Sequence, residues 1–133
     1  MSPTFPPVTV ATLAAINDAW NRYDIDTLMS LMTDDGIFQT TVGPDACGTR
    51  HAGADAVRKA FIAAWTTVSN AQWINAKHFV HGDIGTSQWT LVGTAADGSR
   101  VEVDGVDLFT FRDGKVYLKN TFRKTRVNPA MAQ

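Results

Sequence analysis

The chain has 133 residues, a length typical of one folded domain, and 44% of them are hydrophobic, so it can bury a core and is not intrinsically disordered. Its 12 Lys and Arg residues nearly balance 13 Asp and Glu residues, and the formal net charge is -1. This balance argues against nucleic acid or an anionic membrane surface as a partner.

The sequence contains no recognisable membrane or targeting segment. No apolar stretch reaches the roughly 18 residues of a transmembrane helix, and the first residues lack the basic and apolar regions of a signal peptide. We therefore expect a cytoplasmic protein with one domain over residues 1–133 and an ordered core at about residues 9–126. The single cysteine, Cys47, cannot form an internal disulfide, and we expect neither a metal site nor a cofactor.

Three helices are predicted in the first half of the chain. Apolar residues at helical spacing predict the first from about residue 10 to residue 23. Asp24 can cap a short second helix, which is expected to bury Leu31 and Met32 and to end at the following Asp-Asp-Gly. A third helix follows Gly53, and its apolar residues form one stripe: Val57, Phe61, Ala64, Trp65 and Val68.

Strands are predicted for most of the remaining chain. We expect a strand at residues 37–42 and a turn at residues 43–48. From residue 70 onward, long strands alternate with Gly-containing turns, and such short connections make antiparallel hairpins. The sequence thus predicts an α+β cone, in which about three helices pack on a curved, mostly antiparallel sheet and enclose an apolar pocket for a small molecule.

One carboxylate interrupts an apolar strand face. Alternate residues of the strand 101–112 share a face, and Asp107 lies on the same side as Val103, Phe109 and Phe111. An acid in such a place needs a cation or several hydrogen-bond donors to hold its charge. Two interpretations follow: a salt bridge that only fixes strand register, or a carboxyl that binds a ligand or transfers a proton.

The neighbour of Asp107 depends on the turn at Asp113–Gly114. If this turn has two residues, Asp107 lies opposite Asn120 on the last strand. If a Gly bulge widens it to three residues, Asp107 lies opposite Lys119. We favour the second register, because a buried acid is better stabilised next to a cation.

The favoured register also assigns the two faces of the last strand. It directs four side chains toward the pocket: Tyr117, Lys119, Thr121 and Arg123. It leaves Val116, Leu118 and Phe122 on the outer side of the sheet, where a second copy of the chain could cover them. A homodimer is therefore expected.

Further candidate residues for the pocket are mostly aromatic. The expected ligand contacts outside the last strand are Trp20, Phe38, Thr40, Phe61, Trp65 and Phe109. His78 and His81 fall on opposite strand faces, which disfavours a shared metal, although one of them could transfer a proton. His51 lies in a polar loop and is expected to be solvated.

The run from Asp104 to Val116, with Asn21 to Asp26 near the end of the first helix, resembles the nuclear transport factor 2-like superfamily, and more narrowly its SnoaL-like and ketosteroid-isomerase-like members. The resemblance covers about residues 11–124. It implies a cone-shaped α+β domain, frequently dimeric, with a pocket between helices and sheet. It also implies that Asp107 corresponds to the oxyanion-hole acid of the ketosteroid isomerases, which an apolar site keeps protonated.

Other functional positions of these relatives are not retained. The resemblance places Thr40 at the position of the isomerase base and Ile16 at that of the oxyanion tyrosine. In limonene-epoxide-hydrolase-like members, an Arg and two Asp residues occupy the positions of Gln88, Thr90 and Thr121. The His-Trp-Asp run of SnoaL-type cyclases corresponds to Lys-Asn-Thr at residues 119–121.

These observations predict a cofactor-independent enzyme that moves a proton on a small, largely apolar carbonyl or hydroxyl compound, by isomerisation, dehydration or cyclisation. Asp107 would be the acid or hydrogen-bond donor, and Lys119 its electrostatic partner. The alternative is a non-catalytic ligand-binding or dimerisation module of the same fold, which the missing acids favour.

Overall fold

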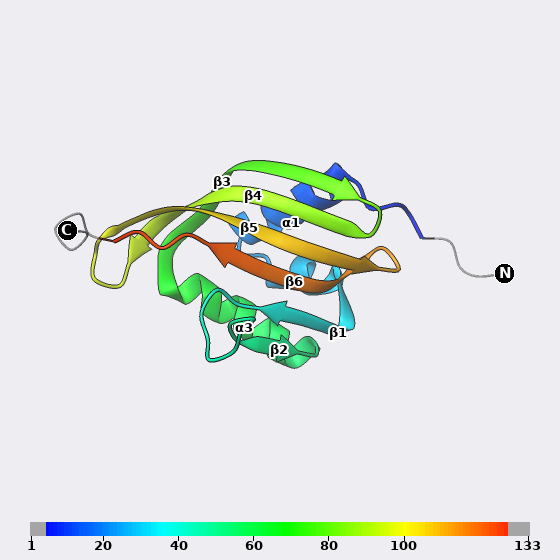
Figure 1. Cartoon of the computed structure of the whole chain (residues 1–133), viewed down its shortest axis with the longest axis horizontal. Coiled ribbons are helices and arrows are strands. Elements are labelled where there is room, and N and C mark those ends of the chain that lie inside the picture. Colours follow the sequence, from blue (N-terminus) through cyan, green and yellow to red (C-terminus); the bar gives the residue numbers. More distant parts are fainter. Residues whose placement is uncertain (1–4, 128–133) are drawn as a thin grey trace.

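Three helices lie on one side of a curved six-stranded sheet (Figure 1). The structure is a computed structural model that describes residues 5–127. The helices are α1 (Val10–Asn21), α2 (Ile25–Ser30) and α3 (Ala54–Thr67). The strands are β1 (Met32–Gln39), β2 (Arg50–Ala52), β3 (Val68–His81), β4 (Ile84–Ala95), β5 (Arg100–Arg112) and β6 (Lys115–Arg123).

The sheet has the order β2-β1-β6-β5-β4-β3, and β1 pairs with β6 in parallel while the other neighbours are antiparallel. The consecutive hairpins from β3 to β6 result from the short turns that the sequence predicts. The parallel pairing of β1 with β6 joins the two halves of the chain in one sheet. Because β1 follows α1 and α2 directly in the chain, this pairing also holds these helices near the sheet. The α+β fold predicted from the sequence is confirmed.

The second helix ends earlier than the sequence predicts. Asp24 caps it as expected, since its side chain accepts a hydrogen bond from the backbone N–H of Thr27 at 3.1 Å. The helix stops at Ser30, and Met32 is already the first residue of β1. The pairing of Met32 with Val116 of β6 explains the difference, because a partner so far along the chain leaves no trace in local spacing. The strand predicted at residues 37–42 accordingly begins earlier and ends at Gln39.

The hairpin between β5 and β6 combines features of the two registers considered. Asp113 and Gly114 both have positive φ, 54° and 78°, which is the pattern of a two-residue type I′ turn, and Arg112 pairs with Lys115. The favoured three-residue turn is therefore wrong. The register then shifts between Thr110 and Phe111, and the shift leaves Tyr117 as an extra residue on β6.

This bulge decides which side chains of β6 face the helices. Beyond the bulge, Phe109 pairs with Lys119 and Asp107 pairs with Thr121. Lys119 and Thr121 therefore lie on the inner face, as predicted. The residue opposite Asp107 is Thr121, however, and not the predicted Lys119. Before the bulge, Val116 is only 2% exposed and belongs to the core, which corrects its predicted outer position.

The main core lies between the helices and the inner face of the sheet. Trp20 of α1 is its centre, and its ring meets those of Phe61, Trp65 and Trp73 with centroid distances of 4.8, 5.0 and 5.4 Å. The side chain of Asn21 fixes α1 to the sheet, because it accepts from the backbone N–H of Trp73 at 2.7 Å and donates to its carbonyl at 3.1 Å. These bonds hold Trp20 over the sheet.

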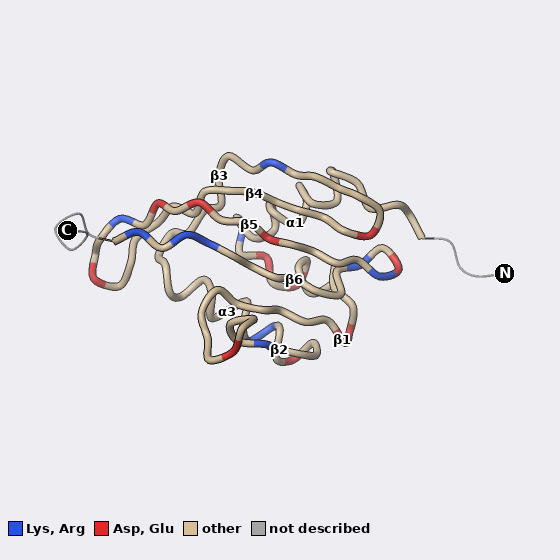
Figure 2. The backbone as a smooth tube through the Cα atoms, viewed as in Figure 1, with Lys and Arg blue, Asp and Glu red and all other residues tan. Residues whose placement is uncertain are grey.

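Charged residues of both signs are distributed along the chain, many of them at turns and strand ends (Figure 2). The densest basic run, Arg123 to Arg126, begins at the end of β6. Within residues 5–127, no helix has the length and apolar character needed to cross a membrane. The cytoplasmic location stays a prediction of the sequence.

Candidate functional site

A cavity of about 500 Å³ lies between the helices and the inner face of the sheet. Residues of α1, α3 and all six strands contribute to its wall, together with the loop after β1. Its aromatic lining consists of Trp20, Phe38, Trp73, Trp89 and Phe109. This size and this apolar wall are typical of sites for small organic molecules.

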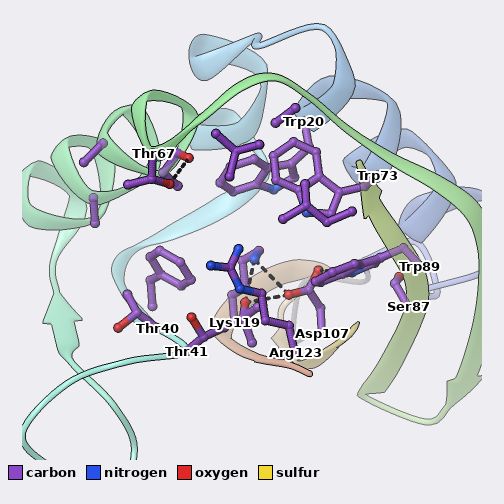
Figure 3. A pocket seen from close by; sticks show the side chains of 18 of the residues that line it. Trp20, Thr40, Thr41, Thr67, Trp73, Ser87, Trp89, Asp107, Lys119 and Arg123 are labelled. Atoms are coloured by element: carbon purple, nitrogen blue, oxygen red, sulfur yellow. Dashed lines mark hydrogen bonds and ion pairs between the residues drawn. The ribbon is translucent and has the colours of Figure 1, made fainter. Parts of the chain in front are cut away.

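A hydrogen-bonded ion pair stands in the wall of this cavity (Figure 3). Asp107 is 7% exposed and Lys119 is 6% exposed, and Lys119 Nζ donates to Asp107 Oδ1 at 2.9 Å. Thr121 Oγ1 donates to the same oxygen at 2.6 Å. Trp89 Nε1 donates to the other oxygen, Oδ2, at 2.9 Å. Two buried charges are thus held together with the donors that each carboxylate oxygen needs.

Strand pairing brings these groups together. Asp107 of β5 is the register partner of Thr121 on β6. Lys119 lies two residues from Thr121 and therefore on the same face. Trp89 of β4 pairs with Gly105, where a Cβ atom would come within 2.4 Å of the indole ring. The absence of a side chain at residue 105 lets this indole lie flat against β5.

The ammonium group of Lys119 has contacts on several sides. Besides Asp107 it donates to Thr121 Oγ1 at 2.8 Å, and it lies 4.8 Å from the ring centroids of both Trp20 and Phe38. Aromatic faces stabilise a desolvated cation. An ammonium has three N–H donors, so the third remains available to an acceptor in the cavity.

The direction of these hydrogen bonds changes the expected role of Asp107. Trp89 and Lys119 can only donate, and the Thr121 hydroxyl accepts from Lys119 and donates its own hydrogen bond to Asp107. The carboxyl of Asp107 is therefore an acceptor in this structure, whereas the sequence suggested a hydrogen-bond donor. The salt bridge that the sequence offered as one interpretation of Asp107 is present, and both of its residues line the cavity.

A second polar pair lies next to the first. Ser87 of β4 is 3% exposed, lines the cavity and is the register partner of Asp107. Its hydroxyl is 2.8 Å from Nδ1 of His78 on β3, and either atom can be the donor, according to the tautomer. Burial lowers the pKa of His78 below its ordinary value, because desolvation disfavours the charged imidazolium.

Most of the predicted contact residues line the cavity, and three do not. Those in the wall are Trp20, Phe38, Thr40, Phe109, Thr121 and Arg123, together with Asp107 and Lys119. Phe61 and Trp65 instead pack on Trp20 in the core. Tyr117 is the bulged residue, and its ring lies under the guanidinium of Arg112, 4.6 Å from Arg112 Cζ to the ring centroid.

Some lining residues were not recognised from the sequence. His51, expected to be solvated, is half-buried on β2, where it pairs with Phe38 and stacks on its ring. Ser87 and Trp89 face the cavity, whereas Gln88 and Thr90, where the resemblance placed epoxide-hydrolase residues, alternate with them on the outer face. The sequence alone leaves Trp89 open between core packing and ligand lining, and the period of two along β4 is the signal that could have placed both it and Ser87.

The polar residues of the cavity show no arrangement for a metal. Among residues 5–127, no three side chains of His, Cys, Asp or Glu come together as ligands. The polar part of the wall consists of the ion pair, several hydroxyl groups, His51 and Arg123, set among aromatic residues.

The fold and this cavity define the class of small α+β proteins with a pocket between helices and a curved sheet. The family model of the SnoaL-like domain matches residues 13–118, most of the chain. The chain therefore belongs to the SnoaL-like family, within the nuclear transport factor 2-like superfamily. A comparison with curated protein sequences found no significant match.

Solved structures share the fold at low sequence identity. A putative SnoaL-like polyketide cyclase from Jannaschia sp. CCS1 has a TM-score of 0.76 and 20% identity, over 93% of this chain and 92% of that one. A putative polyketide cyclase from Pseudomonas putida KT2440 has a TM-score of 0.73 and 16% identity, over 93% and 96% of the two chains. TerC, crystallised with polyporic acid, has a TM-score of 0.71 and 21% identity, over 86% and 90%.

Removal of one partner of the buried ion pair should strongly destabilise the fold. We expect Lys119→Met to lower the free energy of unfolding by about 3–5 kcal/mol, because it leaves the Asp107 charge buried without its cation. Combining it with Asp107→Leu should restore most of this loss. Urea denaturation of the wild type, of Lys119→Met and of the double variant measures these changes.

The matched control is Arg58→Met, which removes an exposed ion pair with Asp26 at 3.0 Å. It should cost less than about 1 kcal/mol. A Lys119→Met cost no larger than that of the control would show that the charges are solvated.

His78 should make the fold less stable in acid. Its pKa is lowered in the folded state, so the unfolded chain binds a proton more readily below pH 6.5. The free energy of unfolding should therefore fall as the pH decreases below about 6.5, and His78→Gln should remove part of this fall. Urea denaturation at several pH values tests this, with His81→Gln at an exposed position of β3 as the control. Equal pH dependence in wild type and His78→Gln would contradict the account.

Proposed function

We propose that the chain binds a small, largely apolar carbonyl or hydroxyl compound in this cavity and catalyses a proton transfer on it without a cofactor. The observation that carries the proposal is the Asp107–Lys119 pair, which is more than nine-tenths buried and lines an aromatic cavity. A charged acid and a charged amine that are themselves shielded from bulk water can act strongly on a molecule bound against them.

The hydrogen bonds of the ion pair support different roles for Asp107 and Lys119 in this proton transfer. A carboxylate has about four acceptor positions, and Asp107 uses two on Oδ1 and one on Oδ2. The remaining position on Oδ2 can take a proton from the carbon next to a carbonyl group, or from a hydroxyl. The third N–H of Lys119 can stabilise the oxygen on which negative charge then develops.

Proton removal of this kind begins isomerisations, dehydrations and cyclisations, so the site supports this group of reactions. Membership of the SnoaL-like family, and the similarity to putative polyketide cyclases and to TerC with its polyporic acid, support a small organic ligand. The chain lacks the acids of the epoxide hydrolases and the His-Trp-Asp run of the cyclases, so we do not assign either reaction to it.

A non-catalytic binding module is the second candidate. Thr40 lines the cavity where the resemblance places the isomerase base, and a threonine hydroxyl does not act as a base at neutral pH. If Asp107 only anchors Lys119, the same cavity would bind ligands without turnover.

We also propose that the outer face of the sheet joins two copies of the chain. Apolar side chains are exposed there on neighbouring strands: Phe79 is 59% exposed, Ile84 44%, Leu108 40% and Phe122 51%. The strand pairing places Leu108 beside Thr86 and Val106 beside Phe122, so these residues lie on one continuous surface. A second copy would remove it from water.

Hydrogen–deuterium exchange tests catalysis without knowledge of the product. In D₂O, the protein should accelerate exchange at the carbon next to the carbonyl of at least one aryl ketone or cyclic enone, followed by NMR. Asp107→Asn should slow this exchange by about 10²- to 10⁴-fold, the usual contribution of a general base. Asp104→Asn, on the outer face of the same strand, is the control and should not change it.

If Asp107→Asn does not fold, Asp107→Glu provides the test instead, because it keeps the negative charge. It should also slow exchange, because the carboxylate moves relative to the ligand. Exchange that is unchanged in a folded Asp107 variant would contradict its role as base. Ligand binding without any exchange would favour the non-catalytic module.

The dimer is tested by sedimentation of the purified chain. We expect a dimer for the wild type and a monomer for Phe122→Asp, because burial of a new carboxylate on this face opposes association. Asn120→Asp adds a carboxylate to the same face, beside Leu108, and should also oppose association. A monomeric wild type at all accessible concentrations would refute the interface.

A further inference from the structure

The cavity contains more positive than negative charge. Two cationic residues, Lys119 and Arg123, line it, and Asp107 is the only acidic residue in the lining. Lys119 and Asp107 neutralise each other in the buried ion pair. Among the described residues, none of the ion pairs or side-chain hydrogen bonds includes the guanidinium of Arg123. One positive charge in the cavity wall is therefore not balanced by an acidic residue of the lining.

Strand geometry places this charge at the cavity. Arg123 is the last residue of β6 and lies two residues beyond Thr121, hence on the same inner face. Its register partner is Gly105, over which the Trp89 ring lies. Figure 3 shows the guanidinium reaching into the cavity beside Lys119 and Asp107, while part of the residue stays exposed.

We infer that the ligand of this cavity is an aromatic compound with a carboxylate, and that Arg123 binds this carboxylate. The inference rests on the proposed function and narrows its substrate class. The planar guanidinium presents paired N–H donors that match the two oxygens of a carboxylate. The aromatic body of the ligand would lie among Trp20, Phe38 and Trp89, next to the Asp107–Lys119 pair.

The arrangement separates recognition from chemistry. Arg123 is exposed at the edge of the cavity and can meet a charged ligand from solvent, where long-range attraction increases the rate of encounter. The buried ion pair lies deeper in the cavity, where it would face the part of the ligand that is removed from solvent on binding. A neutral compound of the same shape would make the apolar contacts but leave the Arg123 charge unpaired.

Naphthoate and naphthamide are suitable probes, because they share size and shape and differ in charge. Isothermal titration calorimetry should show that the wild-type chain binds naphthoate about tenfold more tightly than naphthamide. Arg123→Gln should weaken naphthoate binding by about three- to tenfold and naphthamide binding much less, because the neutral amide loses no ion pair. Arg123→Lys should retain part of the preference, because it keeps the charge but not the paired donors.

Lys124→Gln is the matched control, since Lys124 is exposed just beyond β6 and does not line the cavity. It should preserve the preference for naphthoate. Higher salt should reduce naphthoate affinity in the wild type more than in Arg123→Gln.

Two results would overturn the inference: equal affinity of the wild type for both probes, or a preference that survives Arg123→Gln. If naphthamide binds and naphthoate binds no better, only the carboxylate inference fails. If neither probe binds to the folded wild type, the proposed small-molecule function fails with it.

Discussion

The buried pair of Asp107 and Lys119 is the interaction on which the site depends. Removing two charges from water costs several kcal/mol per ion, and an apolar pair of similar volume is often as stable or more stable. Here the cost is offset by the indole N–H of Trp89, the hydroxyl of Thr121 and the aromatic rings around the ammonium. Because stability alone does not require such a pair, its place in the wall of a cavity points to a ligand.

The backbone creates this pair through two local features of the sheet. The extra residue Tyr117 returns Lys119 and Thr121 to the inner face after a turn that would otherwise point them outward. Gly105 leaves the space in which the Trp89 ring lies, so that its N–H reaches Asp107. The helices complete the enclosure, since α1 carries Trp20 over the ammonium group. The fold therefore positions the charged groups before any ligand arrives.

Periodicity in the sequence was enough to predict the helices, the hairpins and the inward position of Asp107, because these depend on neighbouring residues. The contacts of β1 were not accessible in this way, since its parallel partner β6 lies about 80 residues later in the chain. The cavity position of His51 could not be predicted for the same reason, because it depends on the pairing of His51 with Phe38. The bulge at Tyr117 was not predicted either, because an extra residue interrupts the alternation of inward and outward side chains along the strand. The inward position of Lys119 was inferred correctly from charge, although the turn that supported it was wrong.

The indole N–H of Trp89 offers the most direct test, because it gives a separate NMR signal and contacts the carboxylate at the cavity wall. Titration of the labelled chain with an aryl ketone should shift this signal, together with the amide signals of β5 and β6 residues that line the cavity. A Trp89 signal that stays fixed while amides of the outer residues Leu108 and Phe122 shift would show that ligands bind to the exposed face of the sheet. The buried ion pair would then have no part in binding.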